Sequence, residues 1–185
     1  TGVQTCALPI STSLSAGDDK AHGLALQADG KIIVVGETST NGNDFAVLRY
    51  NADGSLDSSF GGGDGIVTTD FAGGSFDVAY RVVIQADGRI VVGGASGSGT
   101  TDFAVARYLA DGSLDNSFSG DGKQTVDLAG SVDEGLGLAL DATGRIIQVG
   151  AAAVGGQQDF GVVRYNSDGS LDTSFSGDGK LTTAV

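Results

Sequence analysis

The chain has 185 residues, 32 of them glycine, and a formal net charge of −13 at pH 7. This acidic balance argues against nucleic acid and against anionic membrane surfaces as partners, because both bind a basic face. No run of 18 apolar residues occurs, so no segment is predicted to span a membrane. Only two of the 23 acidic residues are glutamates. Aspartate and glycine favour turns where glutamate favours helices, so the composition predicts a turn-rich, all-β protein.

The first ten residues, TGVQTCALPI, share no pattern with the rest of the chain. They resemble the translation of a sequencing-library adapter, and we expect residues 1–17 to form a non-native or disordered segment. This exclusion removes Cys6 and Pro9, the only cysteine and the only proline. We therefore predict no disulfide and no cysteine-based metal site in the repeats.

The rest of the chain is one unit written three times. Asp44-Phe45 recurs as Asp102-Phe103 and as Asp159-Phe160, at steps of 58 and 57 residues. The motif Asp-Gly-Ser-Leu-Asp follows each pair, at residues 53–57, 111–115 and 168–172. The sequence thus predicts unit 1 over residues 18–74, unit 2 over 75–130 and unit 3 over 131–185.

Four strands are predicted in each unit. In unit 1 they cover residues 23–27, 31–35, 45–50 and 66–71, and the same pattern recurs in units 2 and 3. The Asp-Gly pair between the first two strands is typical of a two-residue type I′ hairpin turn. Small polar residues predict a loop between the second and third strands, at 37–43, 95–101 and 151–158. No segment has twelve residues of helical periodicity, so we expect no helix.

Hydrophobic patterning predicts how these strands pack. Residues 32–35 and 45–48 are continuous apolar runs, which are typical of strands covered on both faces. The fourth strand contains Thr68, Thr69 and Asp70 and is expected at an exposed edge. Covered inner strands with a polar outer strand describe propeller blades, whereas a sandwich would give alternating strands. We predict an all-β fold: a partial β-propeller of three four-stranded antiparallel blades.

The runs LQADGKIIVVGE and DFAVLRYNADGSLDSSFGGGDGIVTTDF resemble the bacterial delta-60 repeat. The resemblance extends over nearly all of residues 18–185. It implies a β-propeller within a large secreted or cell-surface bacterial protein, and it assigns no activity. The strand order is also similar to propeller repeats of the NHL type, some of which are enzymes. Propellers usually close with four to eight blades, so we expect further blades of the same chain as partners.

Motifs for catalysis are not found in the sequence. No nucleophile elbow and no nucleotide-binding glycine loop occurs, and His22 is the only histidine. We therefore predict no catalytic residues and no cofactor. The leading interpretation is a non-catalytic binding or scaffolding module with an unknown protein or glycan ligand. One alternative is a propeller enzyme whose catalytic residues lie in further blades.

Two Asp-rich turns suggest a second alternative, a calcium-stabilised adhesion or surface protein. Ca²⁺ takes six to eight oxygen ligands from closely spaced carboxylates and carbonyls. Unit 2 has Leu109 in the first ligand position, and ordinary turn chemistry also explains the recurrence. The candidate metal ligands are Asn51, Asp53, Asp57, Asn166, Asp168 and Asp172.

Residues that differ between units are free to serve a function, whereas recurrent residues are expected to build each unit. The variable polar residues lie in the loops between second and third strands, where sequence drift explains them equally well. These candidates are Glu37, Asn41, Asn43, Thr100, Thr101, Gln157 and Gln158.

An arginine recurs in each otherwise apolar third strand, and a buried guanidinium needs an acidic partner. Asp57 and its equivalents recur with it, just beyond the same strand. We therefore predict three ion pairs, Arg49–Asp57, Arg107–Asp115 and Arg164–Asp172. We also expect the two outermost units to leave an apolar face uncovered, which favours self-association.

Overall fold

The computed structural model describes residues 11–39 and 42–184. Over these residues it contains twelve strands and no helix, and hence no helix that could cross a membrane. Unit 1 contains β1 (Asp19–Leu26), β2 (Ile32–Thr38), β3 (Asp44–Tyr50) and β4 (Ile66–Thr69). Unit 2 contains β5 (Phe76–Ile84), β6 (Ile90–Gly97), β7 (Asp102–Tyr108) and β8 (Lys123–Val126). Unit 3 contains β9 (Asp133–Leu140), β10 (Ile146–Val154), β11 (Gln157–Tyr165) and β12 (Lys180–Thr183).

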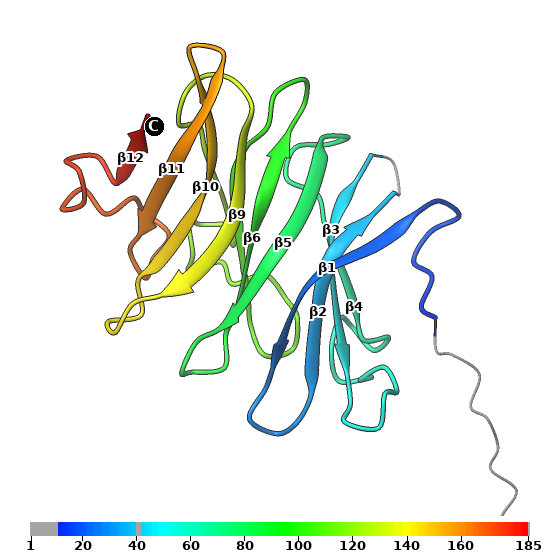
Figure 1. The fold of residues 1–185 in the computed structure, drawn as a ribbon. Helices are drawn as coiled ribbons and strands as arrows, with labels where there is room; N and C mark the ends of the chain where they lie inside the picture. Colours follow the sequence, from blue (N-terminus) through cyan, green and yellow to red (C-terminus); the bar gives the residue numbers. More distant parts are fainter. Residues whose placement is uncertain (1–10, 40–41, 185) are drawn as a thin grey trace, which may run out of the picture.

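Each unit folds into one four-stranded antiparallel sheet whose strands pair in chain order. The sheets stand side by side in chain order, from blue and cyan through green to yellow and red (Figure 1). The first strands, β1, β5 and β9, contact one another, and β4, β8 and β12 form the outer edges. The predicted partial β-propeller of three four-stranded blades is therefore confirmed.

Two local expectations about the connections were wrong. The Asp29-Gly30 turn is not type I′, because positive φ is confined to the glycine, at 84°. A type I turn followed by a left-handed glycine replaces it, and Gln27 N donates to Lys31 O across its base. The expected loop at residues 151–158 is mostly strand, since β10 and β11 extend to a tight Gly155-Gly156 turn.

Most of the apolar core lies between units. We call the face of a sheet that turns toward the next unit its leading face, and the opposite face its trailing face. Phe45 and Phe60 on the leading face of unit 1 are fully buried against Val92 and Tyr108 on the trailing face of unit 2. Residues at equivalent positions form the second cluster, between units 2 and 3. Covering of both faces explains why the inner strands are continuous apolar runs.

A glycine beside the β-bulge of each first strand explains one recurrent sequence feature. A Cβ at Gly94 would lie 1.8 Å from the backbone oxygen of Val78. The same 1.8 Å separation applies at Gly36 and at Gly150. The first strand shifts register at this level in every unit, so the backbone approaches too closely for any side chain.

We expect Gly94→Ala to lower the free energy of unfolding by about 2–3 kcal/mol, because the strand backbone must move to admit the methyl group. Chemical denaturation measures this change. Gly88→Ala is the control: its Cβ meets nothing within 4 Å, and only the positive φ of 85° opposes it. That control is expected to cost about 1 kcal/mol. Equal tolerance of the two substitutions would contradict the assignment of a close backbone approach.

Residues 11–17, which we expected outside the repeats, have the contacts of a junction between units. Leu14 N donates to Asp19 Oδ2 at 2.7 Å, as Phe71 N donates to Asp77 Oδ2 at 2.8 Å in the junction between units 1 and 2. Thr12 hydrogen bonds to the Tyr50 hydroxyl on the trailing face of unit 1. Residues 1–10, which include Cys6 and Pro9, lie outside the described part of the chain.

Candidate functional site

The predicted ion pairs are confirmed in all three units. Arg49 Nε lies 2.6 Å from Asp57 Oδ2, and the equivalent distances in units 2 and 3 are 2.8 Å and 2.7 Å. Arg49 also donates to Ser59 Oγ at 2.9 Å, and its guanidinium lies 4.6 Å from the centroid of the Phe60 ring. We call this set of side chains, with its equivalents around Arg107 and Arg164, the arginine cluster.

A second cation in each cluster was missed by the sequence reasoning. Lys31 Nζ lies 2.8 Å from Asp57 Oδ2, and Arg89 and Arg145 take the same place in the other units. The hydrogen bond from Lys31, with those from the Ser59 backbone and hydroxyl, holds the pKa of Asp57 well below its usual range. The signal was available, because a basic residue follows the hairpin glycine of every unit.

The arginine cluster also joins neighbouring units. The remaining guanidinium nitrogen of Arg49 donates to the backbone oxygen of Ala110 in unit 2. Gly61 N donates to Asp111 O at 3.0 Å beside it. The junction between units 2 and 3 repeats both bonds, from Arg107 to Ser167 and from Ser119 to Asp168. These recurrent residues therefore hold the arc together.

At the candidate calcium ligands the structure shows turn hydrogen bonds. Asp53 Oδ1 accepts from the backbone and the hydroxyl of Ser55, at 3.0 and 2.6 Å. Asn51 Nδ2 donates to the Ser55 hydroxyl, and Asp57 is held by Arg49. Unit 3 repeats these bonds around Asn166, Asp168 and Asp172. Calcium at these residues stays a prediction, and an ion would have to displace these partners.

The variable loop residues separate into two groups. Glu37 is buried; its carboxylate accepts from Lys20 Nζ at 3.0 Å and from Asn43 Nδ2 at 2.7 Å. Among the described residues, no hydrogen bond joins this pair to the remaining loop candidates. Those are Thr100, Thr101, Gln157 and Gln158, of which both glutamines lie in β11; Asn41 lies outside the described residues.

Three carboxylates converge at each internal junction. The groups are Asp44, Asp70 and Asp77, and Asp102, Asp127 and Asp133, with one oxygen of each residue within 4.8 Å of the others. Asp77 is fully buried and accepts from Ser75 Oγ and Phe71 N. Burial, followed by the two neighbouring carboxylates, raises the pKa of Asp44 and, in the second group, of Asp102. Charge repulsion within these groups opposes folding at neutral pH.

We expect Asp102→Asn to stabilise the chain at pH 7. The folded chain binds the Asp102 proton more tightly than the unfolded chain, so the ionised carboxylate costs stability above its raised pKa. The gain should shrink as pH falls toward the ordinary value of 3.8, where both states are protonated. Thermal unfolding across this pH range measures the effect. Asp159→Asn is the matched control, because Ala184 replaces the second carboxylate there; a similar pH-dependent gain in the control would contradict the explanation.

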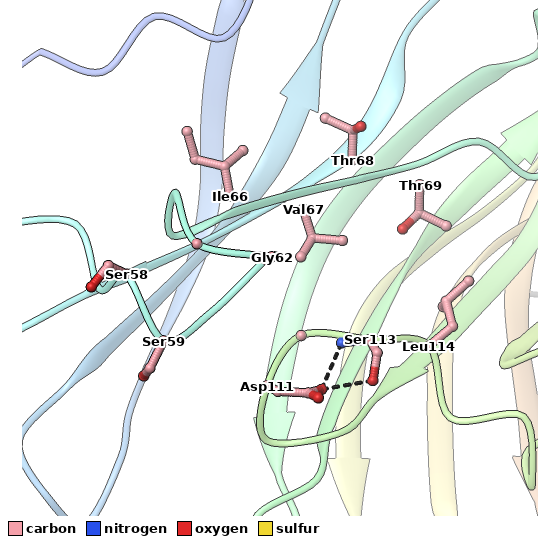
Figure 2. A pocket seen from close by; sticks show the side chains of 13 residues that line it. Ser58, Ser59, Gly62, Ile66, Val67, Thr68, Thr69, Asp111, Ser113 and Leu114 are labelled. Atoms are coloured by element: carbon pink, nitrogen blue, oxygen red, sulfur yellow. Dashed lines mark hydrogen bonds between the residues drawn. The ribbon is translucent and has the colours of Figure 1, made fainter.

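A groove of about 690 Å³ lies between the outer edge of unit 1 and the Asp-Gly turn of unit 2. Figure 2 shows the turn at Asp111–Leu114 facing β4 across this groove, with dashed lines from Asp111 to Ser113. Its remaining lining residues come from 58–59 and the glycines 61–63. The side chains of Ile66, Val67 and Leu114 supply its apolar part.

The corner of unit 1 differs from those of the other units. Unit 1 has three glycines at 61–63, where unit 2 has only Ser119-Gly120 before its aspartate. Gln124, at the position of Val67, hydrogen bonds to Ser119 in unit 2. Unit 1 has neither of these polar side chains, so its groove is lined by glycine backbone and apolar groups. By the rule that residues differing between units are free to function, this groove is the candidate site.

Comparison with known proteins identifies the repeat. A family model described as a domain of unknown function (DUF5122) beta-propeller matches residues 27–60, 85–118 and 142–175. Each match runs from the first hairpin turn to the phenylalanine of the arginine cluster. No curated protein matches the chain. The three matches together cover more than half of the chain, which therefore belongs to the DUF5122 beta-propeller family.

Proposed function

We propose that the chain is a non-catalytic β-propeller repeat module of a larger secreted or cell-surface bacterial protein. The recurrent charged residues support this proposal, because their hydrogen bonds are used to build turns and to join units. The resemblance to delta-60 repeats implies the location. A binding role then belongs to a surface at which the units differ.

The groove of unit 1 carries the binding proposal. β4 pairs with β3 on one side only, so its other edge offers unpaired backbone groups to an added strand. Ile66 and Val67 supply apolar contacts, and Ser113 and Asp111 lie on the opposite wall. The lining includes no aromatic side chain on which a sugar ring could stack, which favours an extended protein segment over a glycan.

A peptide array tests this role. The probe is a set of immobilised heptapeptides that alternate apolar and polar residues, and the wild-type chain is expected to bind a subset of them. Val67→Lys should weaken binding at least about tenfold by placing a charge in the groove. Gln124→Lys, the same change at the equivalent position of unit 2, should leave binding unchanged. Absence of any wild-type binding, or equal losses in both variants, would contradict the proposal.

The calcium-stabilised surface protein remains the second candidate, favoured by the Asp-rich turns. Thermal unfolding in millimolar Ca²⁺ and in EDTA distinguishes it from the first. A rise in melting temperature with Ca²⁺ that is lost in Asp53→Asn and Asp168→Asn would support it. Identical curves in both solutions would rule it out.

A further inference from the structure

The two ends of the arc expose equivalent parts of the same interface. On the leading face of unit 3, Phe160 is 64% exposed, whereas Phe45 and Phe103 at the same position are fully buried. On the trailing face of unit 1, Leu26 is 69% exposed, and its neighbour Leu24 is 66% exposed. Val82, equivalent to Leu24 in unit 2, is only 8% exposed because unit 1 covers it.

The polar groups of the two ends are complementary as well. In units 1 and 2, one guanidinium nitrogen of the arginine cluster donates to the turn of the following unit. Among the described residues, the corresponding nitrogen of Arg164 has no acceptor, and Ser176 N has none. Ala52 O and Asp53 O, which occupy the acceptor positions in unit 1, receive no hydrogen bond in the described part of the chain.

We infer that the leading face of unit 3 binds the trailing face of unit 1 in a second copy of this chain. The contact continues the two internal interfaces: Phe160 packs beside Leu24 and Leu26 of the second copy, and Arg164 donates to its Ala52 carbonyl. Because the two faces differ, the association is head to tail and can continue beyond a dimer. This inference goes beyond the proposed binding role and does not use the groove of unit 1.

One segment has to move for the contact to form. Thr69, at the end of β4, hydrogen bonds to the Tyr108 hydroxyl of unit 2 at 2.8 Å. On unit 1 the equivalent hydroxyl, that of Tyr50, bonds to Thr12. Thr183 holds the position of Thr69 in unit 3, so Thr183 of one copy replaces Thr12 of the next.

Two single-end variants test the direction of this association. Phe160→Asp blocks the leading face of unit 3, and Leu26→Asp blocks the trailing face of unit 1. Sedimentation velocity over the micromolar range should show concentration-dependent association of the wild-type chain. Each variant alone should be monomeric, because every contact needs both faces. An equimolar mixture of the two variants should form a dimer and nothing larger, since one intact face of each kind remains.

Val154→Asp is the control, because Val154 is exposed near the β10–β11 turn; it should associate as the wild type does. Circular dichroism checks that all variants keep their β-structure. A monomeric wild-type chain, or a mixture of variants that stays monomeric, would overturn the inference. Association of either single variant to the wild-type extent would overturn it too. None of these outcomes affects peptide binding in the groove, so the two proposals fail separately.

Discussion

Replacing Arg107 by alanine is expected to lower the free energy of unfolding by about 3–5 kcal/mol, as removal of one partner of a buried ion pair does. Only 1% of the Arg107 side chain is exposed, and Asp115 is 6% exposed. The substitution leaves this carboxylate with Arg89 as its remaining cation, and removes the bonds to Ser117 and to the Ser167 backbone. Urea denaturation monitored by circular dichroism measures the loss.

The repeat supplies matched controls for this prediction. Arg49→Ala should cost nearly as much, because Arg49 is 6% exposed and has the same partners. Arg164→Ala should cost only about 1 kcal/mol, because Arg164 is 20% exposed and joins no following unit among the described residues. Equal losses at Arg107 and Arg164 would show that the bond between units contributes nothing.

Phe118→Ala is the second substitution with a large expected effect, about 3–5 kcal/mol. The ring is fully buried between the guanidinium of Arg107 and the Asp-Gly turn of unit 3, where Gly169 leaves no room for a side chain over it. Truncation leaves a cavity that the paired strands cannot close.

Phe175→Ala is the matched control. Phe175 lies 4.9 Å below Arg164 in the same geometry, but it is only partly buried because no described unit follows it. Its loss should be clearly smaller when both variants are compared by chemical denaturation. A loss at Phe175 as large as that at Phe118 would contradict burial by the next unit.

Recurrence in the sequence predicted the blades and the arginine pairs, since Arg49 could be matched only with acids present in every unit. It did not predict the second cation, Lys31, because its equivalents are arginines and were not compared as one position. The type I′ turn was wrong because Asp-Gly is compatible with more than one hairpin, and only the backbone shows that Asp29 keeps a negative φ.

The candidate groove could not be predicted, because it depends on how two units lie against each other. The three glycines at 61–63 are visible in the sequence, but their distance from the turn at Asp111–Leu114 follows from packing. The junction carboxylates were missed for the same reason. Asp44, Asp70 and Asp77 are separated along the chain, and the junction between units brings them together.

The central claim is that each unit covers the leading face of the unit before it and that unit 3 leaves its own face open. Hydroxyl-radical footprinting of the three equivalent phenylalanines, in dilute and monomeric protein, tests this claim most directly. Phe160 should be oxidised readily, whereas Phe45 and Phe103 should be protected, in line with exposures of 64%, 0% and 0%. Similar oxidation of all three residues would contradict the arrangement.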